Sequence, residues 1–145
     1  KMINYSKKVL SHLAKPRNVE KIEGANGIGE VGNLVCGDVM KLYVRVEDEV
    51  VEEIGFETYG CAAAIATSSV ITEMVKGKRL AEVLKMTNSD ILQVLGGLPP
   101  IKIHCSLLSV DALSEAIWDY LKKNEKKIPK ELGKRHERIM KLKKK

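Results

Sequence analysis

Residues 39–59, VMKLYVRVEDEVVEEIGFETY, decide the fold class of this chain because they alternate apolar and polar side chains with a period of two. That period is typical of strands with one buried face. The acidic residues 47–49 between the two halves predict a turn. The segment therefore predicts an antiparallel hairpin with one face in the core. The apolar positions that share this face include Met40, Leu42, Val44, Val46, Ile54 and Phe56.

The segments around the hairpin complete an α+β arrangement. Gly24–Gly32 predicts a loop that becomes a further strand. Strands come first and helices follow without β-α-β alternation, so we expect a small antiparallel sheet of about three strands packed against several helices. The helices that we expect are Asn4–Ala14, one that starts after Cys61 and ends at Gly77, Leu80–Met86, Ser89–Leu95 with Ser89 as its cap, the long amphipathic helix Ile103–Lys122, and a basic helix, Lys130–Lys144, after Pro129. The apolar stripe expected along the long helix is Ile103, Leu107, Val110, Leu113, Ile117 and Leu121.

Charge is concentrated at one end of a chain that has the length of a single domain, 145 residues. Residues 122–145 hold twelve Lys and Arg against three Glu, whereas the rest of the chain is slightly acidic. We therefore expect a domain over 1–128 with a solvated basic tail over 129–145, and no nucleic-acid partner. No apolar run approaches the ~20 residues of a membrane helix. We expect a soluble, cytoplasmic protein without a membrane partner.

The three cysteines lie at the ends of predicted elements, where a cysteine acts as a metal ligand or nucleophile more often than as a packed core residue. Cys36 falls in a turn between strands, and Cys61 and Cys105 begin helices, whose N-termini favour thiolates. The alternative is that each is a small buried apolar residue. Asp38 shares a strand face with Cys36, and His104 adjoins Cys105. These five residues are a candidate metal site for zinc or [2Fe–2S], and a carboxylate or imidazole beside three thiolates predicts exchangeable binding.

Four segments in register resemble the IscU/NifU-type iron–sulfur cluster assembly scaffolds. The resemblance covers roughly residues 2–122. The chain lacks the long insertion between the second and third cysteines of the zinc-containing SufU branch, and Ala62-Ala63 replace the usual Gly-Ser, which favours a helix directly after Cys61. The four segments are Tyr5-Ser6 with PRNV at 16–19, GNLVCGDVM at 32–40, FETYGCAAAIATSS at 56–69, and LPPIKIHCS at 98–106.

The resemblance implies a scaffold and carrier, not an enzyme. Clusters, [2Fe–2S] or also [4Fe–4S], would be built from iron and desulfurase-derived sulfur and transferred to apo-proteins, with zinc as an occupant of the cluster-free form. Cys36, Cys61 and Cys105 would be the ligands, and Cys105 would also accept persulfide sulfur. Asp38 would promote cluster release, and His104 would be a further ligand.

The resemblance also implies partners. Leu98, Pro99, Pro100, Ile101 and Lys102 would be recognised by a DnaK-type chaperone and its J-type co-chaperone. The prolines fix φ, so we expect this peptide to be extended and presented to the chaperone. Other implied partners are a cysteine desulfurase, a frataxin-like protein, a ferredoxin and apo acceptors, with the chain a monomer or weak homo-oligomer.

Three alternatives remain open from the sequence. The first is a zinc-binding sulfur acceptor of the SufU type, and the second is a structural zinc module with a basic arm. The third is a cysteine enzyme that pairs Cys105 with His104 as base. We expect no bond between these two side chains, because adjacent residues at a helix start generally point apart.

Overall fold

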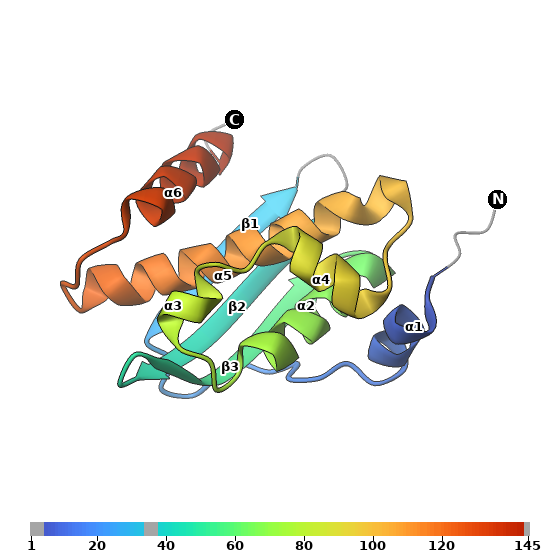
Figure 1. The fold of residues 1–145 in the computed structure, drawn as a ribbon, viewed down its shortest axis with the longest axis horizontal. Helices are drawn as coiled ribbons and strands as arrows, with labels where there is room; N and C mark the ends of the chain where they lie inside the picture. Colours follow the sequence, from blue (N-terminus) through green and yellow to red (C-terminus); the bar gives the residue numbers. More distant parts are fainter. Residues whose placement is uncertain (1–4, 34–37, 144–145) are drawn as a thin grey trace.

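The computed structural model describes the backbone of residues 5–33 and 38–143 as one sheet with helices packed on it (Figure 1). The sheet is antiparallel in the order β1-β2-β3. The predicted α+β class, with its small sheet, long helix and basic C-terminal helix, is therefore confirmed. The elements are α1 (Lys7–Ala14), β1 (Gly27–Asn33), β2 (Asp38–Glu47), β3 (Val50–Tyr59), α2 (Ala62–Val75), α3 (Leu80–Val83), α4 (Asn88–Leu95), the 3₁₀ turn η1 (Pro100–Lys102), α5 (Ile103–Lys123) and α6 (Lys130–Lys143).

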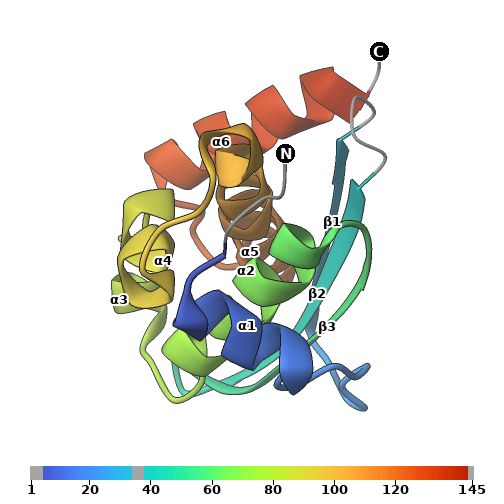
Figure 2. The same ribbon diagram turned by 90° about the vertical axis from the view of Figure 1, so that its right-hand side faces the viewer.

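The hairpin of β2 and β3 has the buried face that its sequence predicts. Val39 pairs with Tyr59 at one end, and the turn at the other end has two central residues, Asp48 and Glu49. Their φ angles of 51° and 62° are those of a type I′ turn, whose twist matches the strands. α2 and α5 cover the inner face (Figure 2). The buried residues there include Met40, Leu42, Val44, Val46, Ile54 and Phe56.

The outer face of the sheet is less exposed than the alternation predicts. Tyr43 belongs to this face but is only 5% exposed. It pairs with Gly55, where a Cβ would stand 2.3 Å from the carbonyl oxygen of Glu20. The segment after α1 therefore crosses the outer face beside Tyr43, and the expectation of a single buried face is wrong at this point.

α5 lies directly on the backbone of β1, because β1 has glycine where the helix crosses it. A Cβ at Gly27 would stand 2.4 Å from the carbonyl oxygen of Ala116, and a Cβ at Gly29 would stand 2.2 Å from that of Ala112. These distances leave no room for a side chain on the strand. Small residues on both elements thus bring the helix against the sheet.

The predicted stripe of α5 is wrong at its first two positions. Ile103 and Leu107 are 36% and 49% exposed, because the first turns of the helix direct them into solvent. The stripe that faces the core is instead rich in small residues, as the close approach to β1 requires. Its main members are Cys105, Leu108, Ala112, Leu113, Ala116, Ile117 and Tyr120.

The cap predicted for α4 is also wrong. Thr87, not Ser89, is the N-cap, and its backbone N–H donates a hydrogen bond to the Asp90 carboxylate, with 2.9 Å between N and Oδ2. This is the reciprocal arrangement of a capping box, which needs the acidic residue three positions after the cap. The preceding helix is shorter than predicted, since α3 covers only the first four residues of 80–86.

The Pro16–Val19 motif connects the chain after α1 to β3 and α2 by hydrogen bonds. Asn18 has a φ of 59°, in the left-handed region that Asn tolerates better than most residues. Its carbonyl accepts a hydrogen bond from the Phe56 N–H at 3.0 Å, and the Arg17 N–H donates to Ser69 Oγ at 2.9 Å. Two of the four segments that carry the family resemblance are thus joined by structural hydrogen bonds.

Candidate functional site

The predicted ligands converge on one end of the sheet as far as the structure describes them. Asn33 ends β1, Asp38 begins β2 and pairs with it, and Tyr59 ends β3 beside them. Cys61 follows two residues later as the N-cap of α2. Of the predicted site, Cys36 and the Asp38 side chain lie outside the described residues.

Cys61 and Cys105 form a close pair of thiols. Their Sγ atoms are 3.6 Å apart, which is too long for a disulfide bond between them. Two sulfurs bound to one tetrahedral ion by bonds of about 2.3 Å stand about 3.8 Å apart. Cys61 is half-buried and Cys105 is fully buried. The pair therefore has the spacing of two ligands of one soft metal centre.

His104 presents one ring nitrogen to this pair. Its Nδ1 lies 3.1 Å from the carbonyl oxygen of Ile101, and since a carbonyl only accepts, Nδ1 carries the proton. The other ring nitrogen, Nε2, lies 3.5 Å from Cys105 Sγ. The expectation that His104 and Cys105 point apart is wrong. The carbonyl bond of Nδ1 orients the ring toward the sulfur.

Hydroxyl groups fix the backbone of Cys105 from the core side. Its carbonyl oxygen accepts from Thr67 Oγ1 of α2 at 3.3 Å and from Ser109 Oγ at 3.1 Å. Because α2 also carries Cys61 at its start, the Thr67 bond joins the two helices close to both thiols. Thr67 sits within the segment 56–69, but its sequence position gives no indication of this partner.

Tyr5 and Lys102 interact electrostatically with the thiols, and the sequence did not assign either of them to the metal site. The charge of Cys61 raises the pKa of the Lys102 ammonium, which also hydrogen-bonds the Cys61 side chain. Burial, followed by the charge of Cys61, raises the pKa of the Tyr5 phenol. The only sequence signal for Tyr5 was its place in the resemblance, because no local pattern links it to Cys61 and Cys105, which follow 56 and 100 positions later.

The prolines predict that the segment Leu98–Lys102 is extended, but the structure shows that only part of it is. Pro99 has extended angles (φ −54°, ψ 141°), but Pro100–Lys102 form the 3₁₀ turn η1, with the Lys102 N–H donating to the Pro99 carbonyl at 2.8 Å. A fixed φ near −65° suits a 3₁₀ turn as well as an extended chain. Ile101 is 67% exposed, so the turn is presented to solvent even though it is folded.

Within the described residues, no group of three or more His, Cys, Asp or Glu side chains is arranged to hold a metal ion. The proposed ligand set draws on two residues outside that description, so the geometry above covers only the Cys61, His104 and Cys105 part of it. No helix in the part of the chain that the structure describes is both long and apolar enough to span a membrane.

Known proteins are similar to this chain in both sequence and fold. The NifU-like N-terminal domain model matches residues 4–127. An iron–sulfur cluster assembly scaffold protein IscU of Archaeoglobus fulgidus is 58% identical over 131 residues, which are 89% of this chain and 85% of that protein. The IscU scaffold protein of Escherichia coli K12 is 50% identical over 127 residues, 85% of this chain and 98% of that protein.

A solved structure agrees with these sequence matches. The putative iron–sulfur cluster assembly scaffold for the SUF system from Fervidobacterium islandicum superposes with a TM-score of 0.66 at 25% identity, over 78% of this chain and 96% of that one. The residues that the family model matches include the sheet, both thiol-bearing helix starts and the 98–106 segment. This chain therefore belongs to the IscU/NifU family, defined by the NifU-like N-terminal domain.

Proposed function

We propose that this chain, an iron–sulfur cluster assembly scaffold and not an enzyme, builds a [2Fe–2S] cluster on Cys36, Cys61 and Cys105 and passes it to apo-proteins. The observation that carries the proposal is the thiol pair 3.6 Å apart with His104 Nε2 3.5 Å from one sulfur. Cys36 precedes Asp38, the first residue of β2, by two positions in the sequence. This connectivity supports its assignment as the third ligand.

The sulfur would arrive as a persulfide on a cysteine desulfurase. The Cys105 thiolate attacks the terminal sulfur of the donor persulfide, the donor S–S bond breaks, and the donor cysteine leaves as a thiolate. A new S–S bond then holds the sulfur on Cys105. Two electrons from a ferredoxin reduce that sulfur to sulfide and restore the Cys105 thiolate.

Cluster release and handover would use the weaker ligands and the exposed turn. Asp38 or His104 completes a set of three thiolates and is exchanged more readily than a fourth cysteine. Leu98, Pro99, Pro100, Ile101 and Lys102 would be the recognition peptide of a DnaK-type chaperone with its J-type partner, and η1 would unwind on binding. A frataxin-like protein would join the desulfurase complex in the cytoplasm, and zinc would occupy the cluster-free site.

Anaerobic reconstitution with ferrous iron, L-cysteine and a desulfurase tests the proposal. The wild-type chain should develop thiolate-to-iron absorption and the Mössbauer doublet of a [2Fe–2S] cluster. Cys36→Ser, Cys61→Ser and Cys105→Ser should each lose stable cluster, since no spare soft ligand remains. Leu107→Ser is the matched control, because Leu107 is on the same helix as Cys105 but exposed. A normal cluster yield in Cys36→Ser would contradict the shared site, and uptake of zinc alone would favour the sulfur-acceptor alternative.

A further inference from the structure

α6 lies outside the part of the chain that the family model matches. That match ends at residue 127, and α6 begins at Lys130. The match to the E. coli relative covers 98% of that protein but only 85% of this chain, so this chain has residues in addition to the shared domain. The helix is nevertheless packed on the domain, since Leu132 and Ile139 are each only 3% exposed.

α6 runs antiparallel to α5, toward the end that carries Cys105 (Figure 1). His136 Nδ1 lies 2.7 Å from Glu115 Oε2, and Arg138 Nη2 donates to Asp111 Oδ1 at 3.0 Å. Residue numbers therefore rise along α6 while those of its partners fall along α5. The last turns of α6 must lie beside the first turns of α5.

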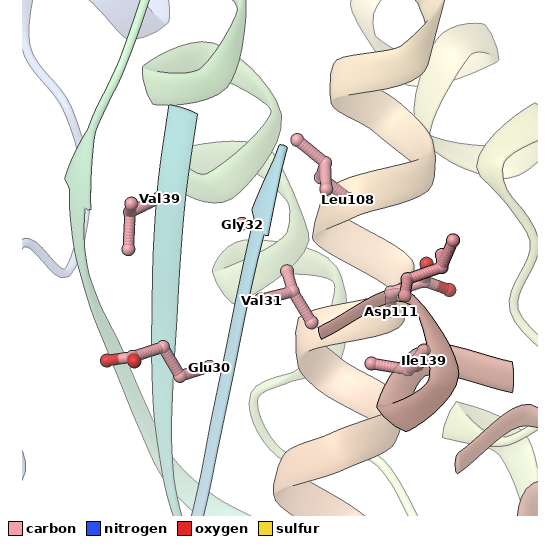
Figure 3. A pocket seen from close by; sticks show the side chains of 8 residues that line it. Glu30, Val31, Gly32, Val39, Leu108, Asp111 and Ile139 are labelled. Carbon is pink, nitrogen blue, oxygen red and sulfur yellow. The ribbon is translucent and has the colours of Figure 1, made fainter. Parts of the chain in front are cut away.

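At that end α6 forms one wall of an apolar pocket of about 310 Å³ (Figure 3). The opposite walls come from the last residues of β1, the first residues of β2 and the second turn of α5. Leu108 is one helical turn after Cys105, and Gly32 is the last residue but one of β1. The pocket therefore lies between the ends of the elements that lead to the candidate ligands. Its apolar lining is Val31, Gly32, Val39, Leu108, Ile139 and Leu142.

We propose that α6 is a brace that holds the first turns of α5 against the end of β1, and that Ile139 is the positioning residue of the brace. Thr67 and Ser109 hold the Cys105 carbonyl from the core side, and on the other side Ile139 of α6 lines the same pocket as Leu108 of α5. The effect on metal binding rests on the proposed function, because it acts through Cys105 as a ligand.

The brace orders the first turns of α5, which carry Cys105, in the metal-free protein. When α6 is loosened, the pocket opens beside Leu108, and the first turns of α5 gain freedom to shift against the sheet. A site that must order its ligands on binding has a lower apparent affinity than one whose ligands are already in place. The brace therefore raises the affinity of the thiol site for a thiophilic divalent cation.

Two alanine variants of the full chain separate a local brace from general stabilisation. Ile139→Ala removes packing at the site end of α6, and Leu132→Ala removes an equally buried side chain at its far end. Amide hydrogen exchange of the metal-free protein should be at least tenfold faster at 103–110 in Ile139→Ala and within twofold of wild type in Leu132→Ala. Cobalt(II) titration, read by thiolate-to-cobalt absorption, should show about fivefold weaker binding in Ile139→Ala only.

Equal acceleration of exchange in both variants would overturn the brace, and so would unchanged exchange in Ile139→Ala. Ile139→Val is the fallback if the alanine variant does not fold, and two- to threefold faster exchange at 103–110 is expected for it; no change would again overturn the proposal. Failure of the wild-type chain to bind cobalt would refute the proposed function, while the exchange result would still decide the brace.

Discussion

Replacing Gly29 with alanine tests how closely α5 must lie on β1. The new Cβ would stand 2.2 Å from the carbonyl oxygen of Ala112 and 2.4 Å from the backbone nitrogen of Ala116. Ordinary contact begins near 3.4 Å, so the helix backbone must retreat by about 1.2 Å. Both neighbours are backbone atoms, which no change of rotamer can move away.

Moving α5 away from β1 should lower the free energy of unfolding strongly, because it affects the whole contact between the helix and the sheet. Overpacking alone costs about 1–3 kcal/mol. A gap of about 1 Å also loses roughly a quarter to a half of the dispersion energy of the atoms that it separates. We expect Gly29→Ala to lower the free energy of unfolding by about 3–4 kcal/mol, which corresponds to a melting temperature lower by roughly 10 °C in a chain of this size.

Urea unfolding of the metal-free protein, followed by far-ultraviolet circular dichroism under reducing conditions, measures this loss. Gly133→Ala is the matched control, because a Cβ there would meet only Ile128 Cγ2 at an ordinary 3.9 Å. Glycine inside a helix is unfavourable, so the control should gain about 0.5–1 kcal/mol. A Gly29→Ala protein within about 0.5 kcal/mol of wild type would refute the close-packing argument.

Three further outcomes are expected. Asp38→Ala should slow cluster transfer to an apo-ferredoxin, followed by circular dichroism, while assembly continues; transfer as fast as wild type would remove Asp38 from the release step. Pro99→Ala/Pro100→Ala should assemble cluster normally but lose acceleration of transfer by the chaperone, J-type protein and ATP; undiminished acceleration would show that recognition lies elsewhere. Burial lowers the pKa of His12, whose Nδ1 lies 2.7 Å from Ser69 Oγ. The folded protein therefore favours the neutral imidazole, and the stability that this side chain contributes is fully present above its ordinary pKa of about 6.5 and is lost as the pH falls below it. Urea unfolding between pH 5 and 8 should show that loss in wild type and a flatter profile in His12→Gln; identical profiles would argue against it.

Sequence reasoning succeeded where the signal is local and periodic. The alternation over 39–59 sets which side chains of the hairpin face the core, because neighbouring residues of a strand point to opposite faces. The position of Cys61 directly before a run of alanine and other small residues set the start of α2, because helix propensity acts within a few residues. The ligand set stays a prediction from the resemblance, and of its members Cys61, His104 and Cys105 are described and lie close together.

Only the tertiary structure decided the features that depend on a distant partner. The inward face of α5 was mispredicted at Ile103 and Leu107, since burial there depends on where the sheet ends and not on the helix pattern. The contact of His104 with Cys105 depends on the turn at Ile101, which orients the ring. The packing of α6 beside the site depends on partners 21 to 27 residues earlier in the chain. Periodicity determines which face of an element is apolar, but which neighbour covers that face is decided by long-range packing, which no local pattern contains.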